Sequence, residues 1–243
     1  NAGSYYVVAT NSAGSATSAV AALAVVQSNF QGVYDGKLGS GGTGGDFALY
    51  VRSDGTGVMI VHFSASDTAL LLDNISLGGD GAFSAGGTTL AHDRMEAVKD
   101  ANGQPPASGI TARDATNVSG TISLSGGLSG SICGLTFFTQ RSAGGSTYAG
   151  FYKAPAVNGG SGDAYAIVDG DGHALVFAQT GTRATVGTGA VDNSGQLNVS
   201  VADGGLMAAK LDPSNGGLSA TVDKGAFAGL AFIGIRDNVT HTD

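Results

Sequence analysis

Tryptophan is absent from this 243-residue sequence, and cysteine and glutamate occur once each, as Cys133 and Glu96. Aspartate occurs 18 times. The short aspartate side chain hydrogen-bonds to nearby backbone in turns, whereas glutamate favours helices, so the imbalance argues against a helical protein. A lone cysteine cannot form an internal disulfide. Cys133 lies in an apolar run, which predicts a small buried side chain rather than a reactive thiol.

Basic residues are also scarce, since 11 Lys and Arg residues stand against 19 acidic ones and give a net charge of -8. This balance argues against nucleic acid or an anionic membrane as a partner. No stretch of about 18 apolar residues is present, so the sequence predicts no transmembrane segment.

Glycine is abundant, with 42 residues against 4 prolines. Because apolar residues are plentiful and no collagen period is present, the glycines indicate tight turns between short strands. Short links between strands favour antiparallel neighbours. We therefore predict an all-β fold, an antiparallel meander barrel or sandwich. The alternating or apolar runs that indicate strands lie at 46–53, 57–64, 68–76, 117–124, 134–140, 148–154, 163–169, 173–179, 195–201, 206–211, 217–222 and 228–235.

Two halves of the chain repeat the same blocks in the same order. GDFALYVRSDG at 45–55 aligns without gaps to GDAYAIVDGDG at 162–172. GLTFFTQR at 134–141, which closes the first copy, matches GLAFIGIR at 229–236, which closes the second. These matches predict an internal duplication. Its two copies are expected at 30–142 and 148–236, opening on Phe30-Gln-Gly-Val-Tyr34 and Tyr148-Ala-Gly-Phe-Tyr152. The sequence does not decide between one barrel and two packed small domains.

A loop insertion at 90–114 interrupts the first copy and has no counterpart in the second. Part of it has the composition of about two helical turns. Loops of this length in compact domains are often functional.

Residues 1–26 form a separate unit, followed by a short linker at 27–29. The motif is Ala2-Gly3, Tyr5, Ala9, Asn11, Gly14 and Leu23-Ala24-Val25. It resembles the last two strands, F and G, of a bacterial immunoglobulin-like domain of the I-set type. The resemblance implies strands at 4–11 and 16–26 and a tyrosine-corner role for Tyr5. Val7 stands where the family usually has its second cysteine.

An isolated two-stranded hairpin is marginal in water, so residues 1–26 require a covering partner. The expected partner is another copy of the chain or a neighbouring domain of the same protein. The residues expected to bind it are Tyr5, Val7, Ala9, Leu23 and Val25.

No motif predicts a catalytic site, a metal site or a cofactor, so we expect a protein that is not an enzyme. His92-Asp93 lies in the insertion without an identifiable nucleophile. Asp169-Gly-Asp171-Gly is the most calcium-like segment, but the closing glutamate of a calcium loop is absent, which favours a hairpin turn.

The sequence therefore predicts a secreted or cell-surface structural protein, plausible as a self-assembling fibre subunit joined by strand addition through the hairpin. The alternative is a ligand- or carbohydrate-binding β-barrel module of a larger surface protein with immunoglobulin repeats.

Overall fold

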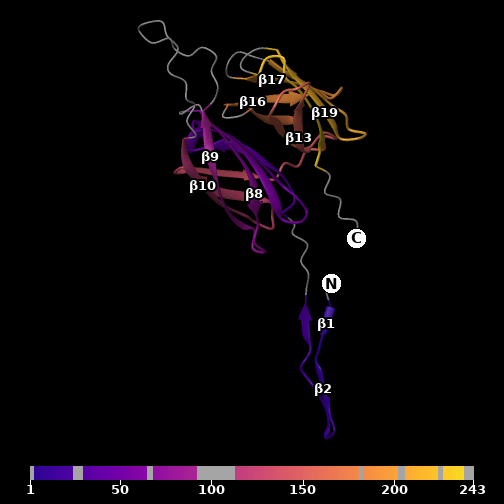
Figure 1. Cartoon of the computed structure of the whole chain (residues 1–243). Coiled ribbons are helices and arrows are strands. Elements are labelled where there is room, and N and C mark those ends of the chain that lie inside the picture. Colours follow the sequence, from indigo (N-terminus) through magenta and orange to yellow (C-terminus); the bar gives the residue numbers. More distant parts are fainter. Residues whose placement is uncertain are drawn as a thin grey trace.

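The computed structural model describes residues 3–23, 30–64, 68–91, 113–180, 183–201, 206–223 and 227–237. Within these ranges the chain contains twenty β-strands, no α-helix and one 3-10 turn, Ser40–Gly42. The strands form an N-terminal hairpin and two closed antiparallel barrels (Figure 1). The predicted all-β meander architecture is confirmed.

Barrel 1 contains eight strands, each hydrogen-bonded to the next along the chain, and its last strand returns to its first. Two of its ladders are short. The β8–β9 ladder has two residue pairs, and the β12–β5 ladder has Phe137 opposite Leu38 plus an isolated bridge. The strands are β5 (Gly32–Leu38), β6 (Gly45–Val51), β7 (Thr56–Phe63), β8 (Thr68–Ser76), β9 (Ala82–Ala91), β10 (Arg113–Ile122), β11 (Gly127–Ile132) and β12 (Leu135–Gln140).

Barrel 2 repeats this order and closes through the pairing of its first and last strands. Successive strands are joined by short turns, as an up-and-down meander requires. The strands are β13 (Gly150–Val157), β14 (Asp163–Val168), β15 (His173–Thr180), β16 (Arg183–Val191), β17 (Gln196–Val201), β18 (Leu206–Leu211), β19 (Gly217–Val222) and β20 (Ala231–Arg236).

Aspartate side chains organise the tight turns, as the composition predicts. In each case Oδ1 accepts the backbone N–H two residues further on, at 2.8–3.0 Å. The predicted hairpin glycines Gly55 and Gly172 adopt φ of 82° and 87°, the left-handed conformation that such turns need. The aspartates are Asp54, Asp80, Asp169, Asp192 and Asp212.

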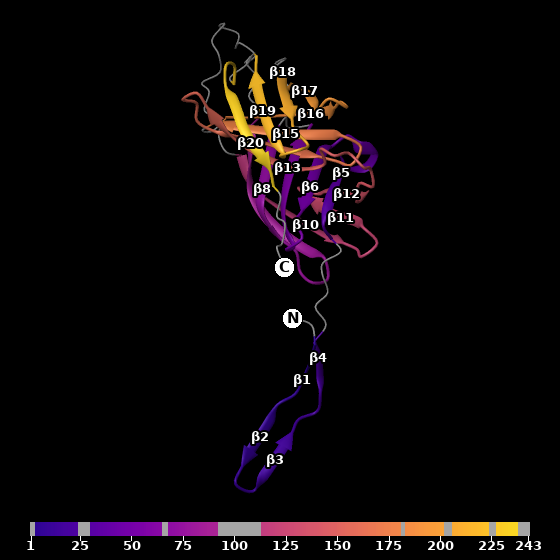
Figure 2. The same ribbon diagram turned by 90° about the vertical axis from the view of Figure 1, so that its right-hand side faces the viewer.

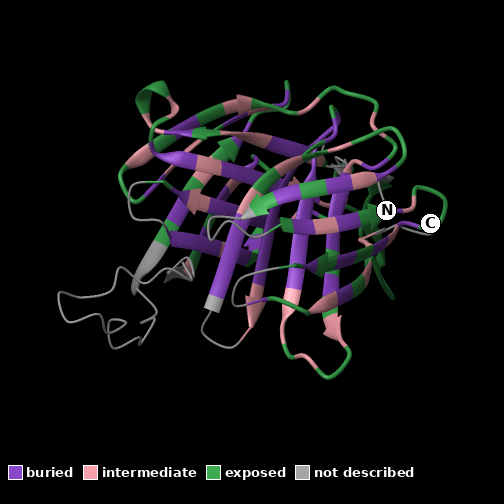
Figure 3. Cartoon of the chain, turned by 90° about the horizontal axis from the view of Figure 1, so that it is seen from above, coloured by how far each residue is buried: buried purple, intermediate pink, exposed green. Residues whose placement is uncertain are grey.

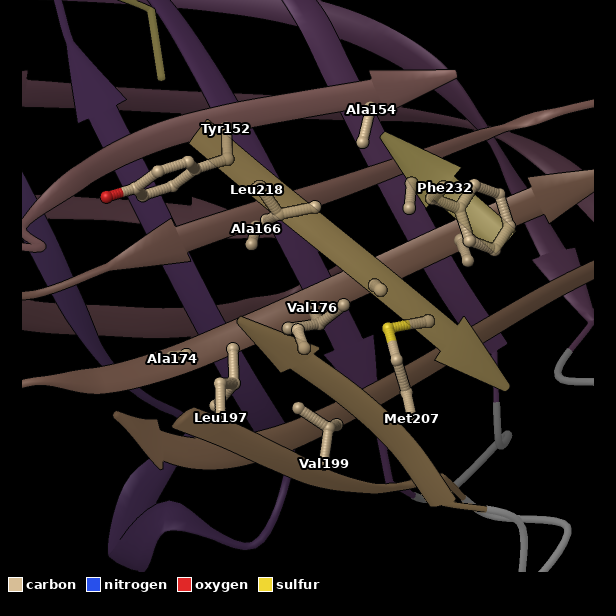
Figure 4. Close-up of a cluster of buried hydrophobic side chains, with 14 of the residues drawn as sticks. Tyr152, Ala154, Ala166, Ala174, Val176, Leu197, Val199, Met207, Leu218 and Phe232 are labelled. Carbon is tan, nitrogen blue, oxygen red and sulfur yellow. The ribbon is translucent and has the colours of Figure 1, made fainter. Parts of the chain in front are cut away.

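Side chains fill the interior of each barrel, and Figure 4 shows those of barrel 2. Tyr152, Met207 and Phe232 are buried among alanines and valines there. A cavity of only about 10 Å³ remains between the strands of barrel 2, roughly the limit for one water. The interior of barrel 2 is therefore a packed core.

A third core joins the two barrels and is called the shared layer here. It explains why runs such as Val58–Val61 and Ala164–Val168 are continuously apolar rather than alternating. One set of their side chains faces a barrel interior and the other faces the opposite barrel, so both faces are buried (Figure 3). Its members are Val33, Ala48, Val58, Ile60 and Ala69 from barrel 1, and Phe151, Tyr165, Ile167, Leu175, Phe177, Ala184 and Val186 from barrel 2.

The aligned sequence blocks occupy matching places in the two barrels. Tyr34 Oη donates to the Phe30 carbonyl at 2.9 Å, and Tyr152 Oη donates to the Tyr148 carbonyl at 2.7 Å. Both tyrosines are fully buried. Each ring thus ties the opening strand of its barrel to the residue four positions earlier.

Several local expectations differ from the structure. Strands β5, β9, β11 and β16 do not correspond to predicted runs. The glycine, serine and threonine residues of β9, β11 and β16 give no apolar alternation, and β5 contains Asp35, Gly36 and Lys37. Cys133 is exposed, with φ of 50°, at the turn between β11 and β12, so the expectation of a buried side chain is wrong. At the expected insertion, Leu90 and Ala91 belong to β9, and residues 113 and 114 belong to β10. Its remaining residues, including His92, Asp93 and the expected helical turns, lie outside the described ranges.

Candidate functional site

The N-terminal hairpin contains four short strands, β1 (Gly3–Tyr5), β2 (Val8–Asn11), β3 (Gly14–Thr17) and β4 (Ala21–Leu23). β1 pairs with β4, and β2 pairs with β3. The Asn11 side chain accepts the Ala13 N–H at 2.8 Å and stabilises the turn. The hairpin extends away from both barrels (Figures 1 and 2).

Each expected hairpin strand is divided in two by a bulge. Residues 6 and 7 connect β1 to β2, whereas residues 18–20 connect β3 to β4, so the second strand carries one extra residue. Ser18 bridges the break, because its N–H donates to the Val7 carbonyl at 2.9 Å while its Oγ accepts the Val7 N–H at 3.0 Å.

All described side chains from 4 to 21 are exposed. Among the expected partner-binding residues, Tyr5 is 50% exposed and Val7 is 70% exposed, and Ala9 is also exposed. The backbone of Leu23 lies in β4, whereas Val25 lies outside the described residues. Tyr6, Val8 and Val20 add further exposed apolar surface that the prediction omitted.

A second candidate site is a cleft of about 490 Å³ that is lined by residues of both barrels and borders the shared layer. Its apolar wall includes Val33, Ala48, Ile167 and Leu175, which continue into the shared layer. Clefts of this size at the junction of two domains are common places for small ligands. The cleft is called the acidic cleft below, because Asp35, Asp46 and Asp169 outnumber the basic residues Lys37 and His173 in its lining.

Strand pairing places the polar residues of barrel 1 in the acidic cleft. On β5, Val33, Asp35 and Lys37 alternate along the strand, and Asp35 pairs with Ala48 of β6. Lys37 forms an ion pair with Asp46. Burial raises the pKa of the Asp35 carboxyl, and the nearby Asp169 carboxylate raises it further. Asp35 is therefore a partly desolvated carboxyl beside another negative charge.

Barrel 2 contributes Asp169 and His173, which flank the turn between β14 and β15. Asp169 is 4% exposed, and its Oδ1 accepts the N–H groups of Asp171 and His173 at 2.9 and 2.7 Å. Its Oδ2 lies 3.1 Å from His173 Nδ1. Asp169, Asp171 and His173 have potential metal-ligating atoms within 4.8 Å of one another. Because both Asp169 oxygens are already used inside the turn, the arrangement matches the expected hairpin turn.

Asp35 was not among the predicted site residues, although charged residues on β5 could have indicated it. Asp35 and Lys37 interrupt the apolar residues on one face of β5, between Val33 and the end of the strand. The sequence offered no way to place Asp35 opposite Asp169, because the two residues belong to different barrels.

No family model and no curated protein matches the chain. One solved structure is similar, that of a protein of unknown function from the DUF3598 family of Nostoc punctiforme. It is 14% identical, and the comparison covers 86% of this chain and 96% of that chain with a TM-score of 0.22. This score does not establish a common fold. Among the described residues, no helix has the length and apolar character needed to span a membrane.

Proposed function

We propose that the chain is a structural protein of the extracellular space or the cell surface that joins its partner by strand addition through the N-terminal hairpin. The observation that carries this proposal is the exposed apolar surface of the hairpin, where Tyr6 and Val7 are 61% and 70% exposed. Apolar strands with free edges pair readily with other chains, because their backbone N–H and C=O groups lack partners on one side.

Closure of both barrels supports the hairpin as the place of addition. A closed barrel has no free edge, since its first and last strands pair with each other. Within the described part of the chain, only the two-stranded segments of the hairpin have open edges. A partner strand can therefore extend these segments without opening a barrel.

A second copy of the chain is the partner we favour. The hairpin has two different edges, formed by β1 with β2 and by β3 with β4. Pairing one edge with the opposite edge of the next copy gives a head-to-tail contact, which generates a fibre when it does not close.

The size of the barrels constrains such a fibre. Each added hairpin advances the sheet by about 10 Å, twice the spacing between strands. A compact domain of about 100 residues has a radius of gyration of roughly 13 Å, so successive barrels cannot lie in a single row. We expect the barrels to splay in several directions around a central twisted sheet of hairpins.

The test compares the full chain with a Val7→Lys, Val20→Lys double variant by sedimentation velocity and negative-stain microscopy. The wild type should form oligomers or filaments, and the double variant should remain monomeric, because charge on an apolar strand opposes pairing. Phe138→Lys is a matched control, since Phe138 is 71% exposed on barrel 1 rather than on the hairpin. Identical assembly of the wild type and the double variant would exclude the proposal.

A ligand-binding module is the second candidate function. The packed interior of barrel 2 disfavours a ligand inside that barrel. The acidic cleft is the observation that favours this candidate, because its volume of about 490 Å³ is suited to a small molecule. Binding in the cleft is compatible with assembly through the hairpin.

A further inference from the structure

We propose that the acidic cleft between the barrels binds a small organic cation, an amine whose ammonium group pairs with Asp35 while its apolar body contacts the wall of the cleft. This site is independent of the hairpin and of any assembly through it.

The charge of the cleft favours a cation. Lys37 is already paired with Asp46, and His173 Nδ1 lies 3.1 Å from Asp169 Oδ2. No basic side chain among the described residues forms an ion pair with Asp35, and the nearby His173 is engaged with Asp169. An ammonium group would supply the missing positive charge and several hydrogen-bond donors.

The cost of leaving Asp35 unpaired supports the same conclusion. Taking a carboxylate out of water is unfavourable unless an opposite charge compensates it. Asp35 is half-buried near Asp169, and desolvation and repulsion oppose its charge more than the nearby His173 favours it. A cation bound at Asp35 relieves both effects, and the gain is larger here than at an exposed surface carboxylate.

The wall of the cleft favours an organic cation over a metal ion. Val33, Ala48, Ile167 and Leu175 provide apolar surface within the same cavity as Asp35. A metal ion gains nothing from such a surface, whereas the hydrocarbon part of an amine gains about 25 cal/mol for each Å² removed from water. A metal would also have to displace the hydrogen bonds that Asp169 makes inside its turn.

The same wall disfavours a neutral sugar. Sugar sites combine several polar groups with an exposed aromatic face. Phe47 lines the cleft, but its ring packs inside barrel 1 against Phe137. The exposed ring in the described cleft is the imidazole of His173, which is engaged with Asp169. The cleft therefore offers carboxylates and aliphatic surface, and no Tyr or Phe face on which a sugar could stack.

The experiment titrates the full chain with cyclohexylmethylamine and, separately, with cyclohexylmethanol at pH 7, followed by methyl NMR. The amine is protonated at this pH, whereas the alcohol has nearly the same shape without charge. We expect the amine to bind at least tenfold more tightly, with the largest shifts at the methyl groups of Ile167 and Leu175. Equal affinities, or shifts confined to other methyl groups, would overturn the proposal.

Two variants identify the carboxylate. Asp35→Asn should remove the preference for the amine while leaving the weaker affinity for the alcohol unchanged, which also shows that the cleft is intact. Asp73→Asn is the matched control, because Asp73 is exposed on β8 and does not line the cleft. Loss of the preference in the control, or its retention in Asp35→Asn, contradicts the assignment. A calcium chloride titration that shifts the same methyl groups when the amine does not would also refute it.

Discussion

Replacement of Gly45 by alanine tests the repeated strand geometry of the two barrels. Gly45 begins β6 at φ of 135°, a conformation that residues with a side chain rarely adopt. An added Cβ would overlap the backbone carbonyl of His62 on β7, so the backbone itself must move. The conformation costs on the order of 1–3 kcal/mol, and one weakened ladder hydrogen bond adds about 1 kcal/mol. We expect Gly45→Ala to lower the free energy of unfolding by about 2–4 kcal/mol.

The assay is urea unfolding followed by far-UV circular dichroism, with a check that the slope against denaturant is unchanged. Gly162 occupies the aligned position in barrel 2, at φ of 128°, and an added Cβ would overlap the Gln179 carbonyl. Gly162→Ala should therefore have an effect of similar size. Gly145→Ala is the control, because an added Cβ there meets no atom within 4 Å and φ is not positive. A loss below about 0.5 kcal/mol for Gly45→Ala would refute the reasoning, because ordinary surface substitutions fall in that range.

Two further predictions concern buried polar groups. Tyr152→Phe should lower the free energy of unfolding by about 1–2 kcal/mol, because it removes the 2.7 Å hydrogen bond to the buried Tyr148 carbonyl; a thermal melt that matches the wild type would contradict this. Asp35→Asn should be more stable than the wild type at pH 7. Burial, followed by repulsion from Asp169, raises the pKa of Asp35 in the folded state, so its ionisation favours the unfolded chain. This advantage should vanish below the ordinary aspartate pKa and grow as pH rises through the folded-state pKa. A difference in melting temperature between Asp35→Asn and the wild type that stays constant across this pH range would contradict the prediction.

The sequence predicted the strand-rich meander and its turns because these depend on local chemistry. Asp54-Gly55 and Asp171-Gly172 specify their hairpin turns by side-chain hydrogen bonding and positive φ, which need no distant contact. Glycine-rich β9, β11 and β16 escaped prediction, because neighbouring strands rather than an apolar pattern hold them in place. The number of barrels stayed open for a similar reason, since closure depends on long-range pairing such as that of Phe137 with Leu38.

The two candidate sites also differ in how far they could be predicted from the sequence. The hairpin was visible in the sequence because its residues are contiguous, although its bulge depends on Ser18 bonding to Val7. The acidic cleft was not visible, because Asp35 and Asp169 come from separate barrels and meet only through packing of the shared layer. The run Val58–Val61 indicated a strand, and only the structure shows that its second face is buried against the opposite barrel.

Closure of each barrel through neighbouring first and last strands has a mechanical consequence. The chain enters barrel 1 beside the point where it leaves, since Tyr34 bridges to Arg141 and the Ser142 N–H donates to the Val33 carbonyl at 2.8 Å. Tension applied between the two ends of this barrel therefore separates β12 from β5, starting at the ends where the chain enters and leaves. Hydrogen bonds loaded in this geometry break one after another rather than together. In a chain under tension, the sparsely bonded β5–β12 ladder would open at low force, while the ladders between other strands remain unloaded.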